Sequence, residues 1–241
     1  MSFYLLKSIK KTEDMMMVAS LSAFLLVAAG ASMRKELQQC KPTTPDVLGP
    51  YYFPDPPKRR QICIDDPEYK QRRLMLVEGY IFDEDCKNPI SGAKIEVWQA
   101  DHNGHYLFRA NCRGYIVSGE TGFYVFLTIH PGKYAIDRNE TLYRPAHVHF
   151  RIVKPGYKTL VTQMYFHGDL NLGSNDACNT CSSSNPDLVV RPQRVCVDES
   201  QSHCLHVVTF DIVMQRGDGI SVVQDENDDY IELSDLVNAG K

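Results

Sequence analysis

The sequence predicts an all-β protein: an antiparallel β-sandwich with a proline-rich N-terminal arm and long loops braced by disulfides. From residue 74 onward, short runs rich in β-branched and aromatic residues are separated by Gly, Pro, Asn and Asp, which is the pattern of strands joined by turns. No helical periodicity of useful length accompanies these runs. Short strands at this spacing are typical of sandwiches and barrels.

Several segments carry the strand pattern, and two longer stretches between them are expected to be loops. The loops are residues 83–92 and the Ser-, Asn- and Pro-rich stretch from 169 to about 201. Trp98 and Phe150 are large apolar residues within strand segments, so they are expected in the sandwich core. The expected strands are residues 74–82, 94–100, 122–129, 148–153, 160–166 and 206–214.

The chain before residue 74 divides into two parts. Residues 1–31 have the features of a secretion signal, because lysines precede a mostly apolar, uncharged run that ends in Ala-Gly-Ala. Cleavage would leave a secreted, extracellular protein with no stable membrane association, whereas an uncleaved signal would act as an anchor. Residues 32–73 are rich in proline, which excludes a regular helix or a central strand. They are expected to form an extended arm that wraps a sandwich domain over residues 74–241.

Cysteine usage supports export. All eight cysteines follow residue 31, and an even number in the exported part suits disulfides in an oxidising compartment. Eight cysteines allow many pairings, so connectivity stays open, and Cys178, Cys181, Cys196 and Cys204 could instead hold zinc. Asn139 begins an Asn-Glu-Thr sequon, which accepts an N-glycan only if the chain is exported. The net charge of −4 gives no basic face for nucleic acid.

The strongest chemical signal is the pair His147 and His149, which are two residues apart in a predicted strand and therefore point to the same face. Two neutral imidazoles suit zinc, copper, iron or nickel. The surrounding sequence is rich in tyrosine, including Tyr106 and Tyr134. A phenol is a poor ligand for divalent ions near neutral pH, whereas a trivalent ion favours the phenolate. Two phenolates with two imidazoles therefore favour Fe(III).

Motifs spread along the chain match one known family in order and register. Over about residues 44–170 the chain resembles the intradiol ring-cleavage dioxygenases, the family of catechol and protocatechuate dioxygenases. Several motifs together are far more specific than a lone His-x-His pair. The matching segments are Gly49-Pro-Tyr-Tyr52, Pro89-Ile-Ser-Gly-Ala-Lys-Ile-Glu-Val-Trp-Gln-Ala-Asp101, Asn103-Gly-His-Tyr106, Gly122 to Tyr134, Arg144-Pro-Ala-His-Val-His-Phe150 and Thr162-Gln-Met-Tyr-Phe-His-Gly-Asp169.

The resemblance implies a non-haem Fe(III) cofactor with four protein ligands. Tyr106 and Tyr134 match the two tyrosines of the family, and His147 and His149 match its two histidines. Tyr134 matches the ligand that leaves the metal when the substrate binds through both of its oxygens.

The resemblance also implies the residues that act on the substrate. Arg144 matches a cation that stabilises negative charge on the substrate ring, and Gln163 matches a glutamine beside the metal ligands. Leu48, Pro50 and Tyr51 match the part of the arm that closes over the ring.

The implied activity is cleavage of an aromatic 1,2-diol between its two hydroxylated carbons, with both atoms of O2 entering a cis,cis-muconate-type product. Two alternatives stay open: a secreted β-sandwich binding module without turnover, and a zinc or copper protein that uses His147 and His149 with other ligands. The chain lacks the helical N-terminal region of the dimeric catechol branch and looks like the secreted single-domain branch. Its cysteine-rich loop after Asp169 has no counterpart in the family pattern.

Overall fold

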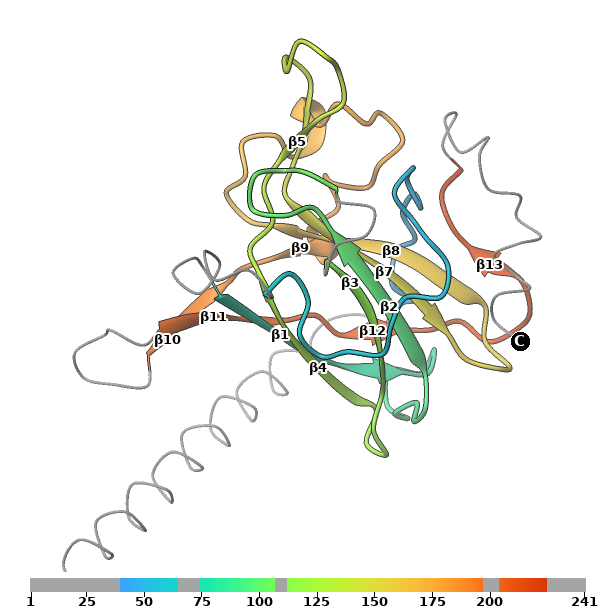
Figure 1. The fold of residues 1–241 in the computed structure, drawn as a ribbon. Helices are drawn as coiled ribbons and strands as arrows, with labels where there is room; N and C mark the ends of the chain where they lie inside the picture. The colour runs from blue at the N-terminus through green and yellow to red at the C-terminus, as the bar shows by residue number, and fades with distance from the viewer. Residues whose placement is uncertain (1–39, 65–73, 107–111, 197–203, 225–241) are drawn as a thin grey trace, which may run out of the picture. The chain divides into compact units, whose positions relative to one another are not determined.

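The computed structural model describes residues 40–64, 74–106, 112–196 and 204–224. Within these ranges the chain forms two β-sheets and a two-stranded hairpin, and it contains no α-helix there (Figure 1). The all-β sandwich predicted from the sequence is confirmed. The secretion signal predicted over residues 1–31 lies outside the described residues. In the part of the chain that is described, no helix has the length and apolarity needed to cross a membrane.

The first sheet is organised around β1 (Leu74–Phe82), which pairs antiparallel with β4 (Phe123–Ile129). On its other side, β1 pairs in parallel with β11 (Cys204–Thr209) and then with β12 (Ile212–Val213). β10 (Gln193–Cys196) extends the sheet beyond β11. The sheet is therefore mixed, because its C-terminal strands return alongside β1 in the same direction.

The second sheet is built from the strands β2 (Lys94–Gln99), β3 (Arg113–Val117), β7 (His147–Val153), β8 (Thr159–Phe166), β9 (Val189–Val190) and β13 (Ile220–Ser221). Its order is β13–β8–β7–β2–β3, with β9 also paired to β8. The central strand β7 is antiparallel to both β2 and β8. Consequently, residues of β7 have direct cross-strand neighbours on both sides.

The main hydrophobic core lies between the two sheets. Along β1 the buried residues alternate with more exposed ones, as a strand with one covered face requires, and Met75 and Val77 are fully buried. Val97 and Phe150 of the second sheet belong to the same core. The expected core position of Phe150 is therefore correct.

The second sheet is covered on its outer face as well. Six of the seven residues of β7 are buried without alternation, so both faces of this strand must be covered. Leu48 and Tyr52 of the arm pack here against Trp98 and Val161, forming a second, smaller apolar cluster. Trp98 is buried, as expected of a core residue, but it lies in this second cluster beneath the arm because its position in β2 points to the outer face of the sheet.

The described part of the arm, residues 40–64, runs along the sandwich. Its backbone forms single bridges from Lys58 to Tyr115 in β3 and from Gln61 to Leu127 in β4. Residues 41–64 belong to the same compact unit as the sandwich. The arm therefore supplies the second cover of the sandwich and does not form a separate layer of regular strands within the described residues.

A small hairpin joins the sheets on one side of the molecule. It consists of β5 (Tyr134–Ala135) and β6 (Tyr143–Arg144), and its register places Tyr134 directly opposite Arg144. Beyond Phe166 a long loop contains the short 3-10 helices η2 (Gly173–Asn175) and η3 (Pro186–Leu188).

Disulfides settle the zinc alternative for the cysteine-rich segments. Cys178 is bonded to Cys181, and Cys196 is bonded to Cys204. These four cysteines therefore cannot form a thiolate zinc site, since none of their sulfur atoms is a thiolate. A third disulfide joins Cys63 of the arm to Cys112, and no cysteine of the described ranges is free.

Candidate functional site

His147 and His149 lie at the start of β7 and point to the outer face of the second sheet. His149 lies between Trp98 of β2 and Gln163 of β8, and its ring stacks on the indole with a centroid distance of 4.7 Å. The Nε2 atoms of the two histidines are 3.1 Å apart. Both side chains are only 2% exposed. The sheet therefore brings two imidazole nitrogens to one buried point.

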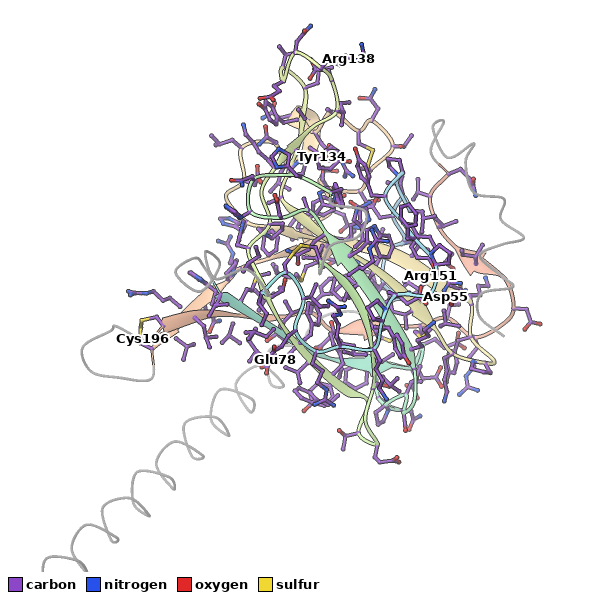
Figure 2. All side chains as sticks on the ribbon, in the orientation of Figure 1. Asp55, Glu78, Tyr134, Arg138, Arg151 and Cys196 are labelled. Carbon is purple, nitrogen blue, oxygen red and sulfur yellow. A yellow bond between two sulfur atoms is a disulfide. The ribbon has the colours of Figure 1, made fainter. Side chains whose placement is uncertain are left out.

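Tyr106, in the segment after β2, and Tyr134, the first residue of β5, reach the same point. The hydroxyl of Tyr106 lies 3.2 Å from Nε2 of His147. The ring of Tyr134 lies 5.2 Å from that of Tyr106 and 5.6 Å from that of His147, measured between centroids. Figure 2 shows Tyr134 at the base of the β5–β6 hairpin, whose tip carries Arg138. The four predicted ligands are thus neighbours, although the two tyrosines lie outside the main sheets.

Two loops cross closely to bring these tyrosines together. The Asp101 carboxylate accepts hydrogen bonds from the backbone N–H groups of Asn103 and His105, both within 2.9 Å, and so shapes the turn before Tyr106. The Asp101 carbonyl oxygen accepts from the Gly132 N–H at 2.8 Å, which ties this turn to the segment before Tyr134. Gly104 has φ +86, and a Cβ there would lie 2.1 Å from a backbone oxygen. Only glycine fits that crossing.

Burial sets the protonation state of the two imidazoles. It is the main cause that lowers the pKa of His147 and of His149, and the nearby Arg144 cation lowers both further. Both rings are therefore neutral at physiological pH. His147 Nδ1 lies 2.6 Å from the Pro145 carbonyl oxygen, which can only accept a hydrogen bond. The ring proton is thus assigned to Nδ1, leaving a lone pair on Nε2 at the meeting point.

The phenols respond to burial in the opposite sense. Desolvation raises the pKa of Tyr106 and of Tyr134, and the Arg144 cation opposes part of this rise. The protein alone therefore keeps both phenols protonated. A strongly charged cation at the meeting point would release these protons, so two imidazoles and two phenols form a donor set suited to Fe(III). Within the described ranges, no group of three or more His, Cys, Asp or Glu side chains is arranged to hold a metal.

Arg144 is buried beside this donor set, with 3% of the residue exposed. Its Nε and Nη2 donate to the two carboxylate oxygens of Asp176 at 3.1 and 3.3 Å. Nη2 also donates to Gln163 Oε1 at 3.2 Å and to the Tyr165 hydroxyl at 2.9 Å. Burial lowers the pKa of Arg144, but Tyr165, Tyr134 and Asp176 together raise it above its ordinary value. The guanidinium is therefore a fixed, permanent cation.

The same network reaches the arm through Asp46. The Tyr165 hydroxyl lies 2.9 Å from an Asp46 carboxylate oxygen and 2.9 Å from Gln163 Oε1. Gln163 Nε2 donates to the Val47 carbonyl oxygen at 2.8 Å. Asp46 is fully buried, and its other carboxylate oxygen accepts from the Val47 N–H at 2.7 Å. Sequence motifs identified Gln163 but gave no reason to select Asp46, Tyr165 or Asp176.

The predicted arm residues differ in how they face the site. Tyr51 stacks on Tyr106 with a centroid distance of 4.1 Å and an interplanar angle of 10°. Leu48 is buried in the cluster beneath the arm, whereas Pro50 is exposed. Gly49 between them has φ +74, and a Cβ there would lie 3.4 Å from the His149 ring. The arm thus passes directly over the imidazole pair.

A buried ion pair fixes the arm from below. Arg151 and Glu96 face each other across β7 and β2, with 0% and 1% exposed and 3.1 Å between Nη1 and Oε2. Glu96 also accepts a hydrogen bond from the Tyr52 hydroxyl at 2.8 Å and pairs with Lys94 at 2.6 Å. One carboxylate therefore holds three donors, and one of these belongs to the arm.

Comparison with known proteins identifies the family. A family model described as dioxygenase matches residues 47–216. A catechol 1,2-dioxygenase of Candida albicans is 31% identical, over 56% of this chain and 50% of that protein. An intradiol ring-cleavage dioxygenase of Aspergillus niger is 32% identical, over 54% of this chain and 47% of that protein. The chain spans about half the length of these curated relatives.

Structural comparison agrees with the sequence comparison. The crystal structure of 3-chlorocatechol 1,2-dioxygenase from Rhodococcus opacus 1CP superposes with a TM-score of 0.64 and 26% identity, over 78% of each chain. The family model covers more than half of the chain and includes the whole of β7 and β8. The chain belongs to the family of intradiol ring-cleavage dioxygenases.

Proposed function

We propose that this protein is a secreted non-haem Fe(III) dioxygenase. It cleaves catecholic rings between the two hydroxylated carbons and uses O2 to give cis,cis-muconate-type products. The observation that carries the proposal is the convergence of two neutral imidazoles and two phenols beside a buried guanidinium. Relatives of this chain are named for catechol, chlorocatechol and hydroxyquinol, which supports a substrate with two adjacent ring hydroxyls.

The residues that would hold the iron are Tyr106, Tyr134, His147 and His149. Fe(III) supplies, when bound, a Lewis acid that acidifies the diol and draws electron density from its ring. His147 is oriented for this role by the hydrogen bond from its Nδ1 to Pro145, and a ligand held in this way keeps its ring orientation. His149 is oriented by stacking on the Trp98 indole.

Tyr134 and Arg144 act together on the substrate. They are direct cross-strand neighbours in the hairpin, so the phenol oxygen of Tyr134 and the guanidinium approach the same bound molecule. With its own proton released by the bound iron, the Tyr134 phenolate would accept one hydroxyl proton from the diol onto its oxygen. Arg144 then stabilises the negative charge that this leaves on the substrate oxygens, since its positive charge is already in place before the reaction.

The arm limits the access of water to this chemistry. Tyr51 covers Tyr106, and Leu48 extends the apolar cluster beneath the arm toward the imidazole pair. An apolar cover excludes water and strengthens the electrostatic effect of Arg144. Gln163 joins the arm to Arg144 through its two hydrogen bonds. It therefore fixes the position of the arm relative to the Arg144 guanidinium.

The first experiment tests the metal. The full chain, purified with Fe(III), should bind one equivalent of iron and absorb visible light by charge transfer from phenolate to iron. Tyr106→Phe should lose the absorption band and most of the iron, whereas Tyr80→Phe, which changes a tyrosine in β1 that is 39% exposed, should keep both. A colourless wild-type protein that binds zinc or copper through the histidines would contradict the proposal.

The second experiment tests turnover. Oxygen uptake should accompany the loss of catechol, with one O2 consumed per ring and both oxygen atoms found in the product by 18O2 labelling. A panel of catechols with and without carboxylate or chlorine substituents would define the accepted ring. Iron-loaded, coloured protein that consumes no O2 with any of them would favour the alternative of a binding module without turnover.

Secretion is the remaining part of the proposal. It is supported by the signal-like residues 1–31, by the disulfides and by the sequon at Asn139, which lies exposed in the turn of the β5–β6 hairpin. Expression in a eukaryotic secretory host should deliver protein without residues 1–31 to the medium. Its mass should fall after glycosidase treatment, and Asn139→Gln should abolish that difference. Retention of the intact chain inside the cell would contradict export.

A further inference from the structure

One carboxylate of the cysteine-rich loop after Asp169 is buried against the site. Asp176 is 6% exposed, and it accepts two hydrogen bonds from one edge of the Arg144 guanidinium. The next residue, Ala177, donates its backbone N–H to the Tyr143 carbonyl oxygen at 3.0 Å. The loop is therefore joined to both residues of β6 by side chain and by backbone.

Asp176 is itself held by the disulfide-closed turn that follows it. Its Oδ1 accepts a third hydrogen bond from the Cys178 N–H at 3.0 Å, and Cys178 is bonded to Cys181. Directly after this bond, the Ser182 N–H donates to Asp46 of the arm at 3.2 Å. The turn thus lies between the hairpin that carries Arg144 and the arm that covers the site, and it is hydrogen-bonded to both.

We propose that Asp176, presented by the turn closed by Cys178 and Cys181, is a positioning residue that fixes Arg144 for catalysis. An arginine side chain has many rotamers, and a carboxylate that binds two of its donors selects one of them. Arg144 lies directly opposite Tyr134 in the β5–β6 hairpin, so its orientation decides where its charge meets the substrate. Among the described residues, Arg144 is the side chain of the site that Asp176 hydrogen-bonds. This inference rests on the proposed function.

Kinetics of substituted proteins test the assignment. Asp176→Asn keeps the shape of the side chain but loses its charge and one acceptor oxygen, and kcat should fall about 10- to 100-fold. KM and iron content should change little, because Asp176 contacts neither the substrate nor the metal ligands. Asp176→Glu, which restores the carboxylate, should recover part of the loss. An unchanged kcat in Asp176→Asn, or a loss that only follows the loss of iron, would overturn the proposal.

The disulfides offer a matched control. Cys178→Ser with Cys181→Ser should lower kcat in the same direction as Asp176→Asn. Cys196→Ser with Cys204→Ser removes a second short-span disulfide, at the β10–β11 end of the first sheet and distant from Tyr134 in Figure 2. That variant should keep the wild-type kcat. Equal losses in the two double variants would refute a specific role for the turn.

A measurement independent of turnover separates this inference from the proposed function. In protein with 15N-labelled arginine, the Arg144 Nε–H should exchange slowly with solvent, and Arg144→Lys identifies its signal by removing it. Asp176→Asn should accelerate this exchange at least tenfold, and the other arginine signals should not change. Wild-type protein that consumes no O2 would contradict the proposed function alone. Unaltered exchange of Arg144 in Asp176→Asn would contradict the positioning role.

Discussion

The Tyr165 hydroxyl joins the arm to the site, and Tyr165→Phe removes it while keeping the ring. The hydroxyl accepts from Arg144 at 2.9 Å and lies 2.9 Å from both Asp46 and Gln163. After the change, Arg144 keeps Asp176 and Gln163. Asp46 loses more, because its Oδ2 atom then retains only the Ser182 N–H at 3.2 Å. The main cost therefore falls on a fully buried carboxylate.

The magnitude follows from the kind of bond that is lost. A hydrogen bond to a charged group contributes about 1.5–3 kcal/mol, so Tyr165→Phe should lower the free energy of unfolding by about 2–3 kcal/mol. For a chain of this size, Tm should then fall by roughly 4–12 °C. Burial raises the pKa of Asp46, and the Tyr165 hydroxyl opposes that rise. Removal of the hydroxyl raises this pKa further, so the stability deficit should be largest at neutral pH and should shrink as Asp46 becomes protonated.

Urea denaturation of both proteins at pH 7.5 and at pH 5 measures the deficit and its pH dependence. Tyr124→Phe is the matched control, because its hydroxyl is equally buried but donates to a neutral acceptor, the Phe210 carbonyl oxygen. Its deficit should be near 1 kcal/mol and should not change over this pH range. A Tyr165→Phe protein as stable as the wild type, or one whose deficit grows at pH 5, would refute the reasoning.

Three further predictions concern other buried features. Glu96→Leu should destabilise the fold by about 3–5 kcal/mol, because it removes the carboxylate from three donors, whereas Arg151→Met should cost less because the carboxylate keeps two donors. Gly49→Ala should destabilise by about 1–2 kcal/mol and weaken iron binding, because it strains φ +74 and brings a methyl group to an imidazole of the site. Replacing the Cys63–Cys112 bridge by serines should cost about 4 kcal/mol, because it closes a span of 49 residues.

Thermal and urea unfolding with iron titration check these three predictions. Equal costs for Glu96→Leu and Arg151→Met would show that the carboxylate is not the shared centre of the cluster. Wild-type iron affinity in Gly49→Ala would show that the arm can shift away from the imidazole pair without cost. A smaller loss for the Cys63–Cys112 replacement than for serines at Cys178 and Cys181 would contradict the dependence on span.

The sequence predicted well those strands whose packing follows a local pattern. β1 has the predicted bounds of residues 74–82, because its buried and exposed residues alternate. The single strand expected over residues 206–214 is instead β11 and β12. The Asp211 carboxylate accepts a hydrogen bond from the Tyr80 N–H at 2.8 Å between them, so a side chain replaces a backbone acceptor where the ladder breaks. The alternation of apolar and polar residues within a segment does not reveal a hydrogen-bond partner that is distant in the sequence, such as Tyr80.

β3 was not predicted from the sequence for a related reason. It is five residues long and contains Gly114, which reads as a loop or turn residue. A Cβ at Gly114 would lie 2.5 Å from the Arg59 side chain of the arm. Glycine is therefore required by a contact with a segment more than fifty positions away, which a search for strand propensity cannot detect.

The site was predictable only where its residues sit in motifs. His147 and His149 are adjacent on one strand face, and Tyr106 and Tyr134 occur in recognisable segments. Asp46 and Tyr165 meet across 119 positions, and Arg144 and Asp176 across 32. Aspartate is common in loops, so nothing in the surrounding residues distinguishes Asp46 or Asp176 from other aspartates. Tyr165 lies in a matching motif, but that motif does not identify Asp46 as its partner. Their role follows only from burial and partners.

The register of the β5–β6 hairpin has a consequence for engineering this protein. Tyr134 faces Arg144 through only two paired positions, and the connecting turn around residues 137–141 lies outside both main sheets. A peptide tag or label inserted in that turn should leave the reactive chemistry intact as long as the pairing is preserved. A slip of one position would place Tyr143 opposite Tyr134 and move the Arg144 guanidinium away from its partners. The pairing register of the hairpin therefore determines whether the site contains this positive charge.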